Sequence, residues 1–224
     1  MNYNAILFDL DGVVIDSNPE ITVFWRGIAT DYGVTLHESD FIQYIYGCPA
    51  RETLATLFPK LDFKEIEKVR TRLIAHETKI KYREIPGATA LLNSLREKNI
   101  PTALVTSGER WKVQEVFGQL GLARLFTVLV TAEDIQKGKP DPECYRLTVE
   151  RLGLTPEKCL VFEDALSGVH AAVKAGIHCI GLQRPENAAF LLKAGAFRVI
   201  PNFTALEYKV SPPNDFTVEK ISQL

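Results

Sequence analysis

The sequence lacks several features that would assign it to a specialised class of protein. It has no basic excess, because 26 lysines and arginines stand against 28 aspartates and glutamates, a net charge of -2. A broad nucleic-acid surface normally needs such an excess, so we expect no nucleic-acid partner. No apolar run approaches the roughly 20 residues that span a bilayer, and we expect no membrane partner either.

A secretion signal and paired cysteines are also missing. The chain runs from Met1 through Asn4 straight into an apolar strand pattern, without the basic start and long apolar stretch of a signal peptide. The four cysteines are scattered, with no Cys-x-x-Cys pair, so each is expected to be a buried or partly buried thiol rather than a zinc ligand or half of a disulfide. These absences favour a cytoplasmic protein, and we expect a monomer.

What the 224 residues do contain is an alternation of short apolar runs and amphipathic stretches. The runs are apolar nearly throughout and too short for helices, which is typical of buried strands. This repetition predicts an α/β fold, a Rossmann-like doubly wound parallel sheet with helices on both faces. The predicted strands are Ala5–Leu10, Thr102–Ser107, Phe126–Thr131, Lys158–Asp164 and His178–Leu182.

One region breaks this alternation. Residues 16–84 show helix-like patterns and no convincing strand, and the strand pattern resumes only afterwards. We therefore expect an α/β core (catalytic) domain made of residues 1–15 and 85–224, and an inserted all-helical cap domain at residues 16–84. Both crossings fall next to the first strand and would form a hinge. The final dozen residues, from about Pro212, are expected to form a loosely held tail.

Polar residues gather at the carboxyl ends of the predicted strands, where open α/β sheets bind ligands. Without a cation the carboxylates among them would repel one another, and some would have to take up protons. Mg²⁺ prefers oxygen ligands and commonly binds one or two carboxylates plus a substrate phosphate, so a Mg²⁺ site is expected. A helix N-cap would explain any one acid, but not four together. The residues are Asp9, Asp11, Thr106, Ser107, Lys139, Glu163 and Asp164.

Asp9 and Asp11 lie two positions apart and can take different roles. An ionised carboxylate can attack phosphorus and split a hard displacement into two easier steps. A second carboxylate can protonate the leaving alcohol and then deprotonate the incoming water. Thr106 and the amide of Ser107 can donate hydrogen bonds to phosphoryl oxygens, and Lys139 supplies a positive charge. The combination suits phosphoryl transfer.

Four segments carry these residues: FDLDGVVIDS (Phe8–Ser17), VTSG (Val105–Gly108), KGKPDPE (Lys137–Glu143) and FEDALSGVHAA (Phe162–Ala172). In this order they resemble the four motifs of the haloacid dehalogenase superfamily. The helical insertion resembles the cap of its phosphoglycolate-phosphatase and β-phosphoglucomutase branch. Dehalogenases lack the second aspartate of the first motif, having no leaving alcohol to protonate. Asp11 therefore favours phosphoryl transfer over halide displacement.

The resemblance implies a role for each acid. Asp9 is the nucleophile and a metal ligand, and Asp11 is the general acid/base, whose backbone carbonyl also binds the metal. Asp164 binds Mg²⁺. Glu163 is either a partner behind the metal ligands or an alternative ligand. The reaction implied is Mg²⁺-dependent hydrolysis of a phosphate monoester through an aspartyl-phosphate intermediate.

The resemblance also implies which residues hold the substrate. Thr106 and the Ser107 amide bind phosphate, and Lys139 neutralises charge. The turn Tyr46–Glu52 corresponds to the family's substrate-specificity loop. Within it, Arg51 either reaches a second phosphate or a sugar hydroxyl, or is a solvated residue in the first turn of a helix.

The expected substrate is a small phosphorylated metabolite, a sugar phosphate or a similar organophosphate. The alternative is a phosphosugar mutase, but β-phosphoglucomutases carry a histidine where this chain has Ile21. His76, like the other histidines, is expected to be structural or at the surface, and Phe24 and Trp25 to be core residues. A catalytically idle binding protein would have no physical reason to keep the charge cluster. Phosphonate cleavage would need a cap lysine, and the cap has none before Lys60.

Overall fold

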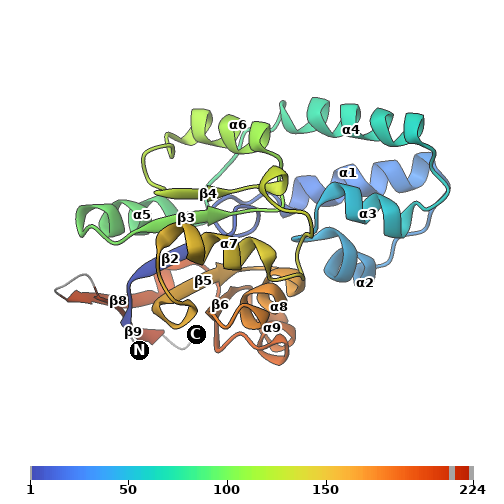
Figure 1. Cartoon of the computed structure of the whole chain (residues 1–224). Coiled ribbons are helices and arrows are strands. Elements are labelled where there is room, and N and C mark those ends of the chain that lie inside the picture. Colours follow the sequence, from blue (N-terminus) through green and yellow to red (C-terminus); the bar gives the residue numbers. More distant parts are fainter. Residues whose placement is uncertain (1, 212–214, 222–224) are drawn as a thin grey trace.

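Within residues 2–211 and 215–221, which the computed structural model describes, six parallel strands form the main sheet. Their order is β4-β3-β2-β5-β6-β7 (Figure 1). The predicted doubly wound α/β sheet is thereby confirmed, with β7 as a strand that the sequence reading missed. The strands are β2 (Ala5–Phe8), β3 (Thr102–Val105), β4 (Val128–Val130), β5 (Cys159–Glu163), β6 (His178–Leu182) and β7 (Arg198–Ile200).

Helices cover both faces of this sheet because its central strands are apolar on both sides. Along β2, Ile6 and Phe8 belong to one buried cluster, while Ala5 and Leu7 belong to the other. The first cluster includes side chains of α5 (Ala88–Glu97) and α6 (Arg110–Leu120). The second includes side chains of α7 (Glu143–Leu152), α8 (Leu166–Lys174) and α9 (Ala188–Ala194).

The segment between β2 and α5 folds into helices with a cluster of their own. Trp25, Phe41 and Leu54 are among its buried residues. We call residues 18–77 the helical insert. Its elements are α1 (Asn18–Asp31), α2 (Glu38–Asp40), a π-helical turn (Phe41–Ile45), α3 (Ala50–Leu57) and α4 (Phe63–Glu77).

The chain enters and leaves the insert at neighbouring points. Ile15 and Glu84 form an isolated antiparallel bridge, and the Asp16 amide donates a hydrogen bond of 2.9 Å to the Arg83 carbonyl. This pairing lies at the expected crossings after the first strand. The division into two domains with a hinge between them stays a prediction.

The C-terminal part differs from the loose tail that we expected. β8 (Leu206–Ser211) and β9 (Asp215–Ile221) form an antiparallel hairpin, and β9 also pairs with β1 (Asn2–Tyr3). Phe216 is fully buried and stacks on Tyr208. The tail prediction is therefore wrong for residues 215–221, because a buried aromatic ring and strand pairing fix them. The remainder of that prediction, residues 212–214 and 222–224, lies outside the described residues.

Two further expectations concerned the state of the cysteines and membrane-spanning helices. All the cysteines lie within the described residues and are free thiols; Cys48 is half-buried, and Cys144, Cys159 and Cys179 are buried. Among the described helices, none has the length and apolar character needed to cross a membrane.

Candidate active site

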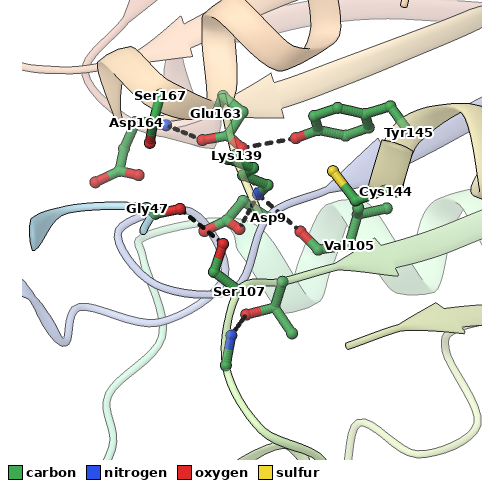
Figure 2. A network of polar contacts seen from close by, with 12 residues as sticks. Asp9, Gly47, Val105, Ser107, Lys139, Cys144, Tyr145, Glu163, Asp164 and Ser167 are labelled. Atoms are coloured by element: carbon green, nitrogen blue, oxygen red, sulfur yellow. Dashed lines mark hydrogen bonds and ion pairs between the residues drawn. The ribbon is translucent and has the colours of Figure 1, made fainter. Parts of the chain in front are cut away.

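The candidate site lies at the carboxyl ends of β2, β3 and β5, on the side of the sheet edge that faces the helical insert. Asp9 follows β2, Thr106 follows β3, and Glu163 ends β5 with Asp164 directly after it. Lys139 comes from the loop between β4 and α7. Parallel strands bring their carboxyl ends to one edge, so residues far apart in the sequence meet here (Figure 2).

Lys139 is the centre of a buried group of charges. Its ammonium nitrogen lies 2.6 Å from a carboxylate oxygen of Asp9 and 2.6 Å from Oε1 of Glu163, and it donates to the Val105 carbonyl at 3.0 Å. The Tyr145 hydroxyl donates to the same Glu163 oxygen at 2.6 Å (Figure 2). Burial lowers the pKa of Lys139, but the two carboxylates outweigh burial and raise it above its usual value. We call Asp9, Lys139, Tyr145 and Glu163 the Lys139 cluster.

Among the described residues, three carboxylates form a group that could hold a metal ion. One oxygen each of Asp9, Glu163 and Asp164 lies within 4.8 Å of the others. The pKa of Asp9 is raised to about 8. Burial is the largest cause, Lys139 opposes the rise, and the neighbouring carboxylates of Glu163 and Asp11 add to it. Burial also raises the pKa of Asp164 well above its usual value. A divalent cation would offset this repulsion and keep the carboxylates ionised, so the all-oxygen donor set fits Mg²⁺.

Gly12 and Gly168 let the backbone approach these carboxylates. Gly12 has a φ of +74°, and a Cβ there would lie 2.0 Å from Oδ2 of Asp164. A Cβ on Gly168 would lie 1.9 Å from Oε1 of Glu163. The Asn18 side-chain amide donates to Oδ2 of Asp164 at 2.6 Å. A larger residue at either glycine would therefore displace a carboxylate of the site.

Asp11 lies beside the Lys139 cluster but has different partners. Its Oδ1 accepts hydrogen bonds from the Ser17 hydroxyl and, at 2.7 Å, from the ammonium group of Lys112. The same nitrogen lies 3.1 Å from Oε1 of Glu77, the last residue of α4. Lys112 is 5% exposed and Glu77 6%. Asp11, Ser17, Lys112 and Glu77 form a second group, the Lys112 cluster, which joins α6 to the helical insert. Asp11 is half-buried, and the other three are buried.

The sequence reading missed Lys112 and Glu77. Each lies in an amphipathic helix among other charged residues, and such residues usually form solvated faces. One feature of the sequence could have pointed to Lys112, namely its position. It falls in the first turn of α6, directly after the loop that carries Thr106. Asn18 and Tyr145 were missed as well, because a lone amide or phenol has no spacing pattern.

Thr106 and Ser107 lie in the loop between β3 and α6. Thr106 is buried, and its hydroxyl oxygen accepts a hydrogen bond of 2.9 Å from the Gly108 amide, which shapes the turn. The Ser107 hydroxyl donates to the Gly47 carbonyl of the helical insert at 2.7 Å (Figure 2). The Ser107 side chain thus links the insert to the strand ends, and phosphate binding by this loop stays a prediction.

A cavity of about 280 Å³ lies between the helical insert and the strand ends. The polar side chains on its sheet side include Asp9, Asp11, Thr106, Ser107 and Lys112. Apolar side chains of the insert form the opposite wall, among them Ile21, Phe24, Trp25, Ile45 and Leu73. The site therefore pairs a charged floor with a largely apolar roof.

Three residues of the insert line this cavity although the sequence favoured another position for each. Phe24 and Trp25 are core residues as expected, at 7% and 5% exposure, but their rings also line the cavity. His76, expected to be structural or at the surface, lines it too, with Nε2 3.6 Å from the Glu20 carboxylate. The apolar roof is thus an extension of the insert's own core.

Arg51 also lines the cavity, from the first turn of α3. Its guanidinium group donates to the Gln136 carbonyl at 3.0 Å, so it contacts the α/β part of the chain. Next to it, the Glu52 carboxylate accepts a hydrogen bond of 2.9 Å from the Gly138 amide, one residue before Lys139. Arg51 therefore helps to hold the insert against the loop that carries Lys139, and substrate binding by its side chain stays a prediction.

The doubly wound sheet with a carboxylate–lysine group at its carboxyl edge defines an α/β protein with a candidate ligand site at its strand ends. Residues 6–182 match the family model of the haloacid dehalogenase-like hydrolases, and the chain belongs to this family. The resemblance expected from the four motifs is confirmed.

Similar proteins match over nearly the whole chain. A phosphorylated carbohydrates phosphatase of Thermotoga maritima is 38% identical over 204 residues, 88% of this chain and 93% of the relative. Hexitol phosphatase A of Escherichia coli is 36% identical over 190 residues, 84% of this chain and 86% of the relative. A solved Thermotoga maritima structure, provisionally named a β-phosphoglucomutase, aligns with a TM-score of 0.66 at 36% identity, covering 88% of this chain and 94% of that one. The similarity therefore includes the helical insert.

Proposed function

We propose that this protein is a Mg²⁺-dependent phosphatase that hydrolyses a small phosphate monoester, of the sugar-phosphate type, through an aspartyl-phosphate intermediate on Asp9. The observation that carries the proposal is the Lys139 cluster, in which a buried ammonium group holds the Asp9 carboxylate at the ligand-binding edge of the sheet. The phosphatase names of the relatives from Thermotoga maritima and Escherichia coli support the substrate class.

The first step transfers the phosphoryl group to the protein. A carboxylate oxygen of Asp9 forms a bond to phosphorus, and the bond between phosphorus and the leaving alcohol oxygen breaks. Asp11 gives its proton to that oxygen. Lys139 compensates the negative charge that develops on the phosphoryl oxygens, in a buried site where such compensation is strong.

The second step returns the enzyme to its starting state. Asp11, now ionised, removes a proton from water, and the water oxygen bonds to phosphorus. The bond between phosphorus and Asp9 breaks and inorganic phosphate leaves. The apolar roof of the cavity limits the water that reaches the phosphoryl group.

Asp9 and Asp164 are the side chains that we assign to Mg²⁺, together with the backbone carbonyl of Asp11. Bound there, Mg²⁺ would polarise the phosphoryl oxygens and neutralise charge. We assign Glu163 a supporting role, because its Oε1 accepts from Lys139 and Tyr145 and its Oε2 accepts from the Asp164 amide at 3.2 Å. It orients Lys139 rather than holding the metal.

The phosphosugar mutase remains the second candidate, since two of the matched structures carry that provisional name. In a mutase a sugar hydroxyl takes the place of water, and the branch uses a histidine of the first cap helix. Here Ile21 occupies that position and lines the cavity. The apolar side chain favours the phosphatase.

The test is phosphate release from a panel of sugar and polyol phosphates, with Mg²⁺ and with a chelator. We expect release that depends on Mg²⁺ and prefers a few related substrates. Isomerisation of a sugar phosphate on addition of glucose 1,6-bisphosphate, without net phosphate release, would show a mutase instead. Release that is unaffected by the chelator would contradict the metal assignment.

A further inference from the structure

Lys112 is a buried lysine for which the proposed reaction has no role so far. Its ammonium group contacts Asp11 at 2.7 Å and Glu77 at 3.1 Å, and it lies at the cavity. We propose that Lys112 is a positioning residue for Asp11 and that Glu77 of the helical insert holds Lys112 in place. By orienting Asp11, Lys112 governs protonation of the leaving group. This inference rests on the proposed function, in which Asp11 is the general acid/base.

The hydrogen bonds on Asp11 select one of its oxygens for proton exchange. The Ser17 hydroxyl and the Lys112 ammonium group both donate to Oδ1. Two donors on one oxygen fix the rotation of a carboxylate, because donors from two directions must both be satisfied. Oδ2 is then the oxygen that carries the proton to the leaving alcohol and later accepts one from water.

The charge balance around Lys112 argues against a role in binding the substrate. Its ammonium group already faces the carboxylates of Asp11 and Glu77. The other oxygen of Glu77 lies 3.3 Å from the Tyr82 hydroxyl, which donates to it, and Tyr82 is itself 6% exposed. These two carboxylates already outweigh the single positive charge of Lys112, so a substrate anion at this ammonium group would meet a net negative set of partners. The group is therefore built to hold Asp11.

The same contacts tie Asp11 to the helical insert. Glu77 ends α4, and Tyr82 lies on the return of the chain to the sheet, where its amide donates to the Gln119 side chain of α6 at 3.1 Å. Lys112 is on α6 as well. With the insert in this position, Glu77 supplies a second carboxylate for Lys112. The geometry of the acid thus depends on the place of the insert.

The experiment compares two leaving groups in single-turnover kinetics of the full-length enzyme with Mg²⁺. A sugar alkoxide needs a proton to leave, whereas p-nitrophenolate leaves without one. For Lys112→Met we expect phosphoryl transfer from the sugar phosphate to slow on the order of 10- to 100-fold, and from p-nitrophenyl phosphate by less than about 3-fold. The KM for both substrates should change little, because Lys112 does not bind them.

Further variants separate positioning from folding. Lys112→Met leaves the carboxylates of Asp11 and Glu77 without their shared cation, which can destabilise the fold. The double variant Lys112→Met/Glu77→Met also removes the buried carboxylate of Glu77 and serves as a second test. It should fold and show the same dependence on the leaving group. Lys112→Arg keeps the charge and should restore part of the rate with the sugar phosphate. Lys193→Met removes an exposed lysine of α9 and should leave both rates unchanged.

The outcomes distinguish this inference from the proposed function. Asp11→Asn is the reference: if it slows the two substrates equally, Asp11 is no general acid, and the acid/base step of the proposed function fails whatever the Lys112 variants do. If Asp11→Asn discriminates between the leaving groups but Lys112→Met and Lys112→Met/Glu77→Met slow them equally, or slow neither, the positioning role of Lys112 is wrong. A discriminating loss in Lys112→Met and in the double variant supports it.

Discussion

The protein contains two buried lysines that each bridge two carboxylates, and the two differ in where their partners come from. Lys139 holds Asp9 and Glu163, both on the sheet edge, and is 0% exposed. Lys112 holds Asp11, from the loop after β2, and Glu77, from the helical insert. The proposed nucleophile therefore has a partner set within the α/β part, while the proposed acid/base depends on contact between two parts of the chain.

This difference indicates how one site can combine a fixed and an adjustable half. Side chains at the ends of paired strands are held by the sheet on both sides, so the Lys139 cluster has little freedom. In the Lys112 cluster Glu77 belongs to the insert, so a shift of the insert away from α6 would remove one of the two carboxylates of Lys112. The predictions below test the two halves in turn.

The largest effect is expected from the nucleophile itself. Asp9→Asn keeps the volume and removes the attacking carboxylate, so turnover should fall on the order of 10⁴-fold or more. The measurement is steady-state phosphate release with the best substrate of the panel. The circular dichroism spectrum should be unchanged. Substantial remaining turnover would show that Asp9 is not the nucleophile. The comparison between a nucleophile cluster around Lys139 and an acid/base cluster around Lys112 would then not hold.

Stability should distinguish the two lysines next. Lys139→Met leaves two fully buried carboxylates without compensation, and breaking such a pair costs about 3–5 kcal/mol of unfolding free energy. Lys112→Met should cost less, because the Asp11 side chain is 16% exposed and water can reach it. Urea unfolding of both variants without Mg²⁺ measures the difference. Equal losses would mean that the insert encloses Asp11 as fully as the sheet encloses Asp9.

Metal dependence sharpens the role of the adjacent acids. Asp164→Asn removes a proposed ligand and should weaken the apparent affinity for Mg²⁺ by more than about 10-fold, whereas Glu163→Gln should lower turnover at saturating Mg²⁺ instead. Titration of activity with Mg²⁺ separates the two results. A reversed pattern would identify Glu163 as the ligand.

The smallest effect on stability is expected at the surface. There one carboxylate bridges two arginines, the reverse of a lysine that bridges two carboxylates. Asp134 lies 2.8 Å from Arg151 and 3.2 Å from Arg110. Burial opposes ionisation, but the hydrogen bonds from Arg151 and Thr131 prevail and lower the pKa of Asp134 to about 2. A lowered folded-state pKa adds stability above the unfolded pKa near 4, and that stability is lost as the pH falls from about 4 to about 2.

Asp134→Asn should therefore cost about 1 kcal/mol or less at pH 7, because the arginines are solvated. The cost should shrink at pH 3. Urea unfolding of the variant and the parent at the two pH values gives the comparison. A cost that grows on acidification would contradict the sign of the shift.

Prediction from sequence succeeded where chemistry has a fixed spacing. The central strands follow from apolar runs. Asp9, after β2, and Lys139, in the loop after β4, follow from motifs read along the chain. Lys112 and Glu77 could not be found in this way, because their contact depends on how α4 and α6 pack. Helix patterns specify which face is apolar but not which polar side chain a neighbouring helix will cover.

The C-terminal error has a similar cause. The stretch from Asp215 to Ile221 alternates in polarity, but its partners are β8 and the two residues of β1 at the other end of the chain. A short strand next to two prolines carries little local signal of such remote pairing. β7 was missed because only Arg198–Ile200 belong to the sheet, and so short a run gives no clear strand pattern.

The pairing of β1 with β9 also bears on how the protein is made. Asn2 lies opposite Thr217, and Tyr3 opposite Phe216. During synthesis β1 leaves the ribosome long before β9 exists, and contacts between such distant residues form late in folding. Until Phe216 and Thr217 have emerged, β1 has no strand to pair with in this sheet. The order of translation thus delays closure of the small sheet until β9 is made.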